Sequence, residues 1–466
     1  MMLRGFIETV QWVFLGYFVL LNVFYLGLAF IALFGLRRYM GGISAAERVY
    51  SHLQMPISLV VPAYNEAATI ATSVRALLQL RYQHFEVVIV NDGSKDETLE
   101  VLKREFELQP FPEAYRVQIR TRPVRGVYRS AKYPNLRVVD KENGGGKADA
   151  TNAGINAARH PIFYCGDADS ILDPGSMEHV VRPFLEDPRT VACGGTVRII
   201  NGCKVRGGVL EQVGLPKNPL ALVQVVEYLR AFLGGRLGWS AINGMLIVSG
   251  AFGVFHRDTV VAAGGFRADV IGEDMEMTVR LHRTLSARGE RYRVAFIPDP
   301  VCWTDAPEDL ATLAKQRKRW QRGLAESLWT NRKLCFARGS GAAGWLAFPF
   351  FVLFELLSPL IEVGGLVVMA GAFGLGMMTG TGFLAFLAAS LALGLMLSTT
   401  ALLLEELSFH TYPKARHVLA LFVVAILENI GYRQLMAVWR LQALYGWLRG
   451  SKIHWGVMKR KADWQA

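Results

Sequence analysis

FEVVIVND, at residues 85–92, is a short apolar run that ends in a carboxylate. Five similar runs lie around it, and helical stretches separate the first four members of the series. Short strands that alternate with helices are typical of βαβ units, so we predict an α/β domain with a Rossmann-like mixed sheet. The other runs are ISLVVPAY at 57–64, LRVVDK at 136–141, PIFYCGDAD at 161–169, VACGGTVRII at 191–200 and AFGVFHR at 251–257.

The residues that follow these strands are candidates for ligand binding, because open α/β sheets bind ligands beyond the carboxyl ends of their strands. We therefore expect a site at the ends of the first four runs. In chain order its residues are Ala63, Tyr64, Asn65, Glu66, Asp92, Lys147, Asp167 and Asp169.

Asp167 and Asp169 flank Ala168 at the end of the fourth run. Alternate residues of an extended strand point the same way, so both carboxylates can face one cation. Hard oxygen ligands suit Mg²⁺ or Mn²⁺ bridging a diphosphate. Surface turns also produce such acid pairs, but the position directly after an apolar strand favours a metal site.

GGGKADATNAG at 144–154 combines three glycines with a lysine. It lacks the hydroxyl residue that follows the lysine in ATPase phosphate loops, so ATP hydrolysis is not expected. Lys147 can instead contact a diphosphate as a point charge, while the glycines permit close approach of the backbone. A flexible surface turn is the alternative interpretation.

IGEDMEM at 271–277 supplies adjacent acids, Glu273 and Asp274, ahead of a helical stretch. A carboxylate can act as the general base that takes a proton from an attacking hydroxyl. Acids are also common in the first turn of a helix, where they complement its dipole. Both interpretations stay open at this point.

KQRKRW at 315–320 lies on a helix predicted over 311–329. Gln316, Arg319 and Trp320 are spaced i, i+3 and i+4 and share one face. An indole can stack on a sugar ring while an arginine and an amide hold phosphate or hydroxyl groups. The alternative is a basic amphipathic helix at a membrane surface, and one helix can be both. The other basic residues, expected on the remaining faces, are Lys315, Arg317, Lys318 and Arg322.

The 466-residue chain is 52% hydrophobic and 19% charged, which suits a protein that lies partly in lipid. Stretches 11–36, 345–372 and 383–404 carry few or no charges, and each exceeds the roughly 20 residues that a membrane helix needs. A fourth stretch, 418–427, is shorter and charged residues follow it. We expect an interfacial or re-entrant helix there, with a true span as the alternative.

Basic residues beside these stretches favour the cytoplasmic side of a membrane. We therefore expect a multi-pass protein of the inner (cytoplasmic) membrane, with an outside N-terminus and a cytoplasmic α/β domain. A signal peptide is the competing interpretation of residues 1–36, but the apolar run is too long for one. The basic residues are Arg37, Arg38, Arg48, Lys414, Arg416 and those of 446–462.

Three parts follow: 1–50, a transmembrane helix with a connector; 51–335, the α/β domain with interfacial helices; and 336–466, membrane and interfacial helices with a basic tail. Anionic lipids and a diphosphate explain the net charge of +12, so no nucleic acid partner is expected. The five cysteines contain no CxxC pair, which argues against a zinc site or a disulfide framework.

The combined motifs resemble family 2 glycosyltransferases over roughly residues 55–330. The Gln-x-x-Arg-Trp element at 316–320 is similar to that of the membrane-integrated processive branch, which includes cellulose, hyaluronan, chitin-oligosaccharide and poly-N-acetylglucosamine synthases. The resemblance implies a GT-A type nucleotide-sugar-binding domain inserted between transmembrane helices.

The resemblance also implies roles for the candidate residues. Tyr64 and Asp92 would contact uridine, Lys147 the diphosphate, and Asp167 with Asp169 the nucleotide and a Mg²⁺ or Mn²⁺ ion. The base would be Asp274, beside Glu273. The acceptor and pyrophosphate side would be lined by Gln316, Arg319 and Trp320, with the segment SGAFG at 249–253 at the acceptor end.

The chain departs from the pattern of that branch at two positions. Gly272 stands where a threonine often precedes the Glu-Asp pair, and Asn91 stands where a second acid often precedes the uridine-loop glycine. These departures weaken assignment to the cellulose type and favour relatives that use N-acetylhexosamines. Nothing after residue 440 resembles a cyclic-dinucleotide-binding domain, so direct control by such a messenger within this chain is not expected.

The implied function is inverting transfer of a sugar from a UDP-sugar, with UDP-GlcNAc or UDP-Glc favoured, to a growing β-linked polysaccharide. Asp274 would deprotonate the acceptor while a metal ion and Lys147 stabilise the departing UDP. The expected partners are the donor, a glycan acceptor and membrane lipids, and export or accessory subunits stay open. The alternatives are non-processive transfer to a lipid carrier, and a catalytically silent nucleotide-sugar-binding membrane component.

Glu355 and Glu362 are seven residues apart inside an apolar stretch, so they share nearly the same helix face. Carboxylates within a membrane usually face protein or a watery path. One hypothesis is that this face lines a glycan channel. The other, equally weighted, is that one of these acids pairs with an arginine of the interfacial helices.

Overall fold

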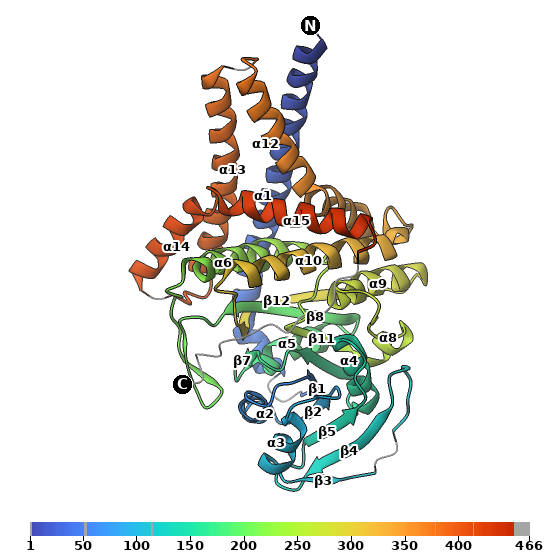
Figure 1. The fold of residues 1–466 in the computed structure, drawn as a ribbon. Helices are drawn as coiled ribbons and strands as arrows, with labels where there is room; N and C mark the ends of the chain where they lie inside the picture. Colours follow the sequence, from blue (N-terminus) through green and yellow to red (C-terminus); the bar gives the residue numbers. More distant parts are fainter. Residues whose placement is uncertain (1, 51–53, 113–114, 378, 413, 452–466) are drawn as a thin grey trace.

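The computed structural model describes residues 2–50, 54–112, 115–377, 379–412 and 414–451. A ten-stranded sheet forms its lower part, in the order β3-β4-β5-β2-β1-β6-β11-β8-β12-β7 (Figure 1). A separate two-stranded sheet pairs β9 (Lys204–Arg206) with β10 (Val209–Gln212). The large sheet contains β1 (Ile57–Ala63), β2 (Phe85–Asn91), β3 (Leu108–Pro110), β4 (Val124–Ser130), β5 (Leu136–Lys141), β6 (Ile162–Gly166), β7 (Ile171–Leu172), β8 (Thr190–Ile199), β11 (Phe252–His256) and β12 (Arg293–Thr304).

Four of the six predicted runs form the parallel centre of the sheet, as β5, β2, β1 and β6. The other two runs become β8 and β11, and β11 is antiparallel to both of its neighbours. The sheet is therefore mixed, and the predicted α/β class is confirmed.

The long strand β12, parallel to β8, was not predicted from the sequence. Pro298 and Pro300 interrupt its apolar pattern, and the pairing register shifts between Ile297 and Pro300. Proline lacks the N–H that a ladder needs and is tolerated within sheets at irregularities of this kind. These prolines therefore explain why the sequence pattern does not predict β12.

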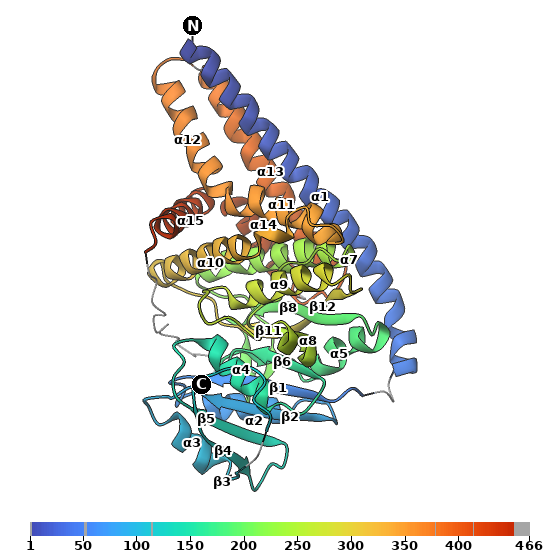
Figure 2. The same cartoon turned by 90° about the vertical axis from the view of Figure 1, so that its right-hand side faces the viewer.

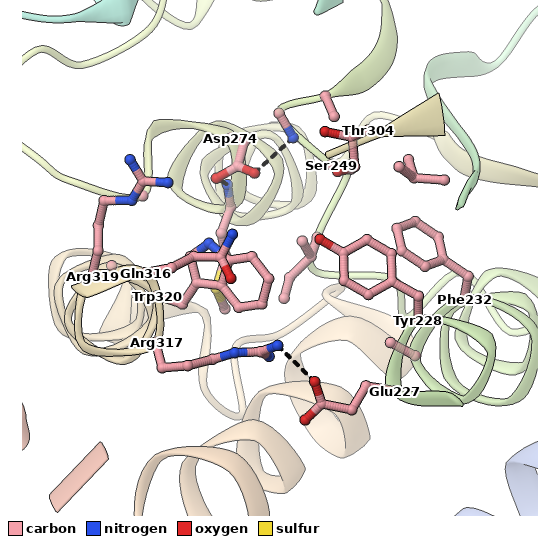
Figure 3. A pocket seen from close by; sticks show the side chains of 18 of the residues that line it. Glu227, Tyr228, Phe232, Ser249, Asp274, Thr304, Gln316, Arg317, Arg319 and Trp320 are labelled. Carbon is pink, nitrogen blue, oxygen red and sulfur yellow. Dashed lines mark hydrogen bonds and ion pairs between the residues drawn. The ribbon is translucent and has the colours of Figure 1, made fainter. Parts of the chain in front are cut away.

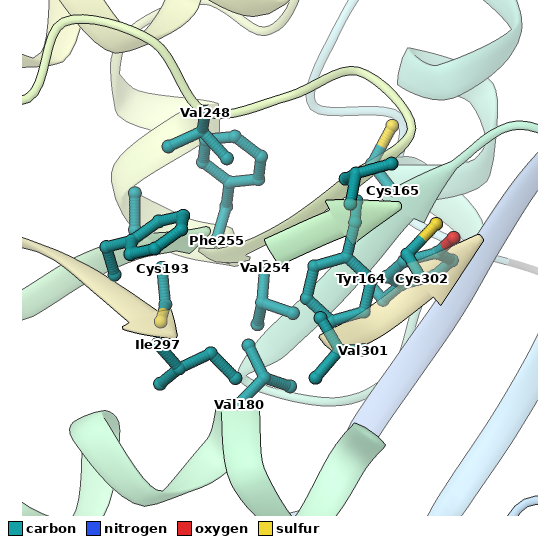
Figure 4. Close-up of a cluster of buried hydrophobic side chains, with 14 of the residues drawn as sticks. Tyr164, Cys165, Val180, Cys193, Val248, Val254, Phe255, Ile297, Val301 and Cys302 are labelled. Atoms are coloured by element: carbon teal, nitrogen blue, oxygen red, sulfur yellow. The ribbon is translucent and has the colours of Figure 1, made fainter. Parts of the chain in front are cut away.

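Buried side chains from several strands and one helix pack together in the core of the sheet. Tyr164 of β6, Val254 of β11 and Val301 of β12 are buried in one cluster with Val180 of α5 (Figure 4). Close packing of this kind resists displacement, because cores lose contacts when atoms shift. The helices beside the sheet are α2 (Ile70–Leu78), α3 (Thr98–Glu105), α4 (Lys147–Ala157), α5 (Ser176–Glu186), α8 (Arg257–Ala262) and α9 (Glu273–Ala287).

A layer of helices crosses the molecule between the sheet and three long helices that point away from it, α1 (Met2–Tyr50), α12 (Ser358–Gly374) and α13 (Gly380–Glu406), as Figure 1 shows. It contains α6 (Pro219–Leu229), α10 (Leu310–Thr330) and α15 (Tyr432–Leu448). The helix predicted over 311–329 is α10, and it carries the KQRKRW motif into this layer. Shorter elements beside the layer are the π-helical turn η1 (Arg230–Arg236), α7 (Leu237–Ala241), the 3₁₀ turn η2 (Arg332–Leu334) and α14 (Ala415–Leu427).

Helices α1, α12 and α13 extend together away from the sheet, as Figures 1 and 2 show. Helices α1 and α13 contain the expected membrane stretches 11–36 and 383–404, and α12 contains the end of the stretch 345–372. Among the described residues, one helix, at Thr9–Gly41, is long and apolar enough to cross a membrane, or up to three if each of two bent pairs counts as one span.

The expected span over 345–372 is one of these bent pairs. It begins with η3 (Ala343–Ala347), α11 (Phe348–Phe350) and η4 (Phe351–Leu356), and turns by 41° before α12. Pro359, in the first turn of α12, cannot donate a backbone hydrogen bond to the preceding turn. The second pair joins α14 to α15 at 58°. Of the basic segment 446–462 used to predict orientation, residues 452–462 lie outside the described residues.

Candidate active site

A pocket of about 870 Å³ runs from the ends of the strands to the membrane-side helices. Residues of the predicted strand-end site, Lys147 and Asp167, line one end, and Asp274 lies in the middle. The α10 residues Gln316 and Trp320 face the same space (Figure 3). Motifs that extend from Lys147 to Trp320 in the sequence are therefore brought into one cavity.

Lys147 is the first residue of α4 and connects two parts of the pocket. Its Nζ donates to Asp167 Oδ1 over 2.7 Å and to the carbonyl oxygen of Gly250 over 2.6 Å. Gly154 lets α4 lie close to β1, since a Cβ there would come within 2.3 Å of Val60. Burial opposes the charge of Lys147, but the negative charges of Asp167, Cys165 and Glu273 together outweigh burial, so the pKa of Lys147 is raised. The ammonium is therefore a fixed cation at the strand ends.

Asp167 and Asp169 occupy different environments at the end of β6. Asp167 is partly exposed and lines the pocket, whereas Asp169 is 8% exposed and is not among the lining residues. The described part of the chain contains no group of three or more His, Cys, Asp and Glu side chains placed to hold a metal ion. Any cation here would take most of its ligands from a substrate and water.

Asp274 is held by the same glycine that binds Lys147. The Gly250 N–H donates to Asp274 Oδ2 over 2.8 Å, while the Gly250 carbonyl accepts from Lys147. One residue of the SGAFG segment thus sets the spacing between a cation and a carboxylate. The resemblance had placed this segment at the acceptor end, but its sequence gave no sign of this bridging role.

Gly272, the residue before α9, packs directly against α10, and Glu273 is the first residue of α9. A Cβ on Gly272 would lie 2.9 Å from the Cα of Gly323 on α10, so the two backbones touch. The threonine common at this position in the similar branch would not fit this contact. Burial, with the neighbouring charge of Asp274 adding to it, raises the pKa of Glu273 to about 7.

The α10 motif presents more of its residues to the pocket than its spacing predicted. Gln316, Arg319 and Trp320 line it as expected, and Trp320 is 43% exposed. Gln316 is buried, and its Oε1 has no hydrogen-bond partner within the described part of the chain. Arg317, expected on another face, also lines the pocket and pairs with Glu227 over 2.6 Å. The pocket is therefore broad enough to reach more than one face of α10.

The residues expected around uridine lie outside the lining of this pocket. Asp92 is buried, and its Oδ1 accepts from Lys141 Nζ over 2.6 Å and from the Gly144 N–H over 3.1 Å. It therefore supports the glycine-rich loop. The first strand ends in Ala63, which is buried, Tyr64 and Asn65, which are exposed, and Glu66, whose N–H donates to Thr98.

Comparison with known proteins identifies the architecture. The profile of Glycosyl transferase family group 2 matches residues 162–427, and that of Glycosyl transferase family 2 matches residues 58–219. The chain belongs to Glycosyl transferase family group 2. The matched ranges contain the strand-end carboxylates, the acid pair and α10, so this glycosyltransferase carries its candidate residues within the segments that define the family.

The glycosyltransferase is similar to curated poly-beta-1,6-N-acetyl-D-glucosamine synthases. That of Staphylococcus aureus is 29% identical over 272 residues, which cover 58% of this chain and 55% of the relative. That of Staphylococcus epidermidis is 27% identical over 281 residues, which cover 59% and 57%. The chain thus spans about half the length of these relatives.

Two solved structures are also similar to the glycosyltransferase. The mannosyltransferase PcManGT of Pyrobaculum calidifontis, in complex with GDP-Man and Mn²⁺, has a TM-score of 0.48 at 18% identity, over 87% of this chain and 99% of that one. S. aureus TarS 1–349 in complex with UDP has a TM-score of 0.40 at 14% identity, over 87% and 94%.

The membrane end of the pocket in this glycosyltransferase is polar as well as aromatic. Glu355 of η4 accepts from the Tyr25 hydroxyl over 2.5 Å and lies 3.5 Å from Arg440 of α15. All three residues line the pocket, whereas Glu362 does not. Glu355 therefore faces the cavity and pairs with an arginine of the crossing layer, as the pairing hypothesis expected, while a glycan channel at this face stays a prediction.

Proposed function

We propose that this glycosyltransferase transfers a sugar from a UDP-sugar to a growing β-linked polysaccharide at the cytoplasmic membrane. The observation that carries the proposal is the Gly250 bridge, in which one residue binds both Lys147, a cation suited to a diphosphate, and Asp274, a carboxylate suited to an acceptor hydroxyl. UDP-N-acetylglucosamine is the favoured donor, because the similar curated proteins are poly-beta-1,6-N-acetyl-D-glucosamine synthases.

The proposed reaction is a single displacement. Asp274 takes the proton of the acceptor hydroxyl, the hydroxyl oxygen forms a bond to the anomeric carbon, and the bond from that carbon to the UDP oxygen breaks. Lys147 is held beside Asp167, and a fixed cation there would stabilise the negative charge of the departing diphosphate. Attack opposite the leaving group turns an α-linked donor into a β-linked product.

The strand-end carboxylates fit a Mg²⁺ or Mn²⁺ ion that is bound jointly with the diphosphate. Asp167, with Asp169 behind it, would hold the ion, and the partly exposed Asp167 side chain leaves room for substrate oxygens. Such cations usually keep waters and substrate phosphates as ligands instead of a full protein cage. When bound, the ion would supply further neutralisation of the leaving group.

The α10 face supports a glycan acceptor. The buried Gln316 Oε1, unpartnered among the described residues, can accept from a sugar hydroxyl or amide. The exposed ring of Trp320 can stack on a pyranose. Tyr64 and Asp92 are proposed at the uridine side, with Asp92 acting through the loop that it supports.

The membrane helices support a multi-pass protein whose glycosyltransferase domain lies in the cytoplasm. The pocket continues from Asp274 toward Tyr25 of the apolar helix α1, and this continuity favours passage of the product toward the membrane. Anionic lipids and accessory subunits are the proposed partners of the crossing layer.

The test is UDP release by detergent-purified full-length protein with a panel of UDP-sugars and Mg²⁺ or Mn²⁺, followed by sizing of the product. Release with one donor and long product supports a processive polymer synthase. Addition of a single sugar to a lipid would favour lipid-carrier glycosylation instead. No release with any donor would reject the proposed function for the isolated chain.

A further inference from the structure

Arg317 stacks on the acceptor-end tryptophan while binding a carboxylate from another helix (Figure 3). Its guanidinium carbon lies 4.6 Å from the centre of the Trp320 ring. Its Nη2 donates to Glu227 Oε2 of α6 over 2.6 Å. A planar guanidinium that is fixed by a carboxylate can hold an aromatic ring from one side.

Glu227 is itself held from a third helix. The hydroxyl of Tyr432, the first residue of α15, donates to the same Oε2 over 3.0 Å. The side chains of Arg317 and Glu227 are only 12% and 16% exposed, so water has little access to this ion pair. Removing one charge would leave the other unpaired in a largely buried place.

We propose that Glu227 is a positioning residue that, through Arg317, fixes the orientation of the Trp320 ring against the acceptor sugar. The inference rests on the proposed function, because it takes Trp320 as the acceptor platform. A ring free to rotate would hold the acceptor hydroxyl near Asp274 for a smaller fraction of the time, and misplacement of reacting groups slows transfer. We call the contacts among Glu227, Arg317 and Trp320 the relay. Tyr432, which donates to Glu227, links the relay to α15.

The decisive variant is Glu227→Gln in the full-length protein, because glutamine keeps the size of the side chain and removes its charge. With UDP-GlcNAc as donor and short β-linked N-acetylglucosamine oligosaccharides as acceptors, kcat/KM for the acceptor should fall about 10-fold, the usual effect of losing one charge-assisted hydrogen bond. The affinity for UDP should not change.

Glu405→Gln is the matched control. It breaks the Arg198–Glu405 pair, which has the same 2.6 Å separation and joins β8 to the end of α13. A purely structural role for Glu227 predicts equal losses of acceptor kcat/KM in the two variants, and that result would overturn the proposal. In a Trp320→Ala background, Glu227→Gln should have no further effect; an undiminished effect there would also overturn it.

A measurement without turnover separates this inference from the proposed function. In protein labelled with 5-fluorotryptophan, the ¹⁹F resonance that disappears in Trp320→Phe belongs to Trp320. We expect that resonance to shift in Glu227→Gln and to stay in place in Glu405→Gln. If the wild-type protein transfers no sugar, the proposed function fails while the shift still supports the relay; an unmoved resonance rejects the relay whatever the activity.

Discussion

At the strand end of the pocket, Lys147 and Asp274 both bind the backbone of one residue, Gly250. At the membrane end, Glu355 joins Tyr25 and Arg440 through its side chain, and only the contact from Arg440 also reaches its backbone carbonyl. The first arrangement sits on a sheet with a packed core. The second connects helices α1 and α15 with the π-helical turn η4. Backbone contacts fix reacting groups more tightly than long side chains do, because fewer rotatable bonds separate them.

Because of this difference, we expect the two ends of the cavity to have different roles in the reaction. Chemistry that needs defined distances is expected at the strand end, where groups must be held in place for proton transfer. The membrane end is expected to guide a longer glycan. Its contacts with the sugars must break and form again as the glycan passes. Substitutions at the two ends should therefore change different properties of the reaction.

The largest effect is expected from Asp274→Asn. Asparagine keeps an oxygen that can accept from Gly250 but cannot take the acceptor proton, so transfer should fall by about 10²–10⁴-fold, the contribution of a general base. UDP release and UDP affinity measured on the same preparation test this prediction. Near-normal transfer by the variant would remove Asp274 as the base and weaken the contrast between the two ends.

Part of the strand end was accessible from the sequence, because its signals are local. Lys147, Asp167 and Asp274 each follow a recognisable strand or precede a helix, and periodicity placed Gln316, Arg319 and Trp320 on one face. The Gly250 bridge was not accessible, since its partners are 103 and 24 positions away and its role lies in the backbone.

The membrane end was not predictable in the same way. Glu355 meets Tyr25 across 330 positions and the Arg440 side chain meets its backbone across 85. Spacing within one segment carries no information on such pairs. The sequence offered only two acids in an apolar stretch. The pairing of Glu355 with Arg440 agrees with one of the hypotheses drawn from them, and the glycan channel stays a prediction.

Gly272→Thr tests the junction between the two ends. Its Cβ would press on the Gly323 backbone, and overpacking of this kind destabilises by about 1–3 kcal/mol. We expect a lower melting temperature and weaker transfer, because α9 carries Asp274 and α10 carries Trp320. Gly234→Ala is the control, since no atom lies within 4 Å of a Cβ there. Equal stability of the two variants would contradict the close contact.

Glu355→Gln should have a smaller and different effect. The amide keeps a partner for the Tyr25 hydroxyl but loses the charge that pairs with Arg440, a partly exposed pair worth about 0–1 kcal/mol. We expect shorter products with initial UDP release within a few-fold of the wild-type rate. Product length unchanged in Glu355→Gln would exclude this residue from guiding the glycan.

Glu273→Gln should give the smallest effect, visible only as a pH dependence of stability. Burial and the charge of Asp274 raise the pKa of Glu273 from 4.5 to about 7, so the folded protein binds a proton there more tightly than the unfolded chain. The stability gained from this proton is complete when the pH is below the pKa of Glu273 in the unfolded chain. It is lost as the pH rises through the pKa of Glu273 in the folded protein. The free energy of unfolding of the wild type, relative to Glu273→Gln, should therefore decrease as the pH rises from 4.5 to beyond 7. Chemical denaturation of both proteins across this range measures it, and a difference that stays constant with pH would show that Glu273 is charged in the folded enzyme and belongs with Asp274 as a second anion at the strand end.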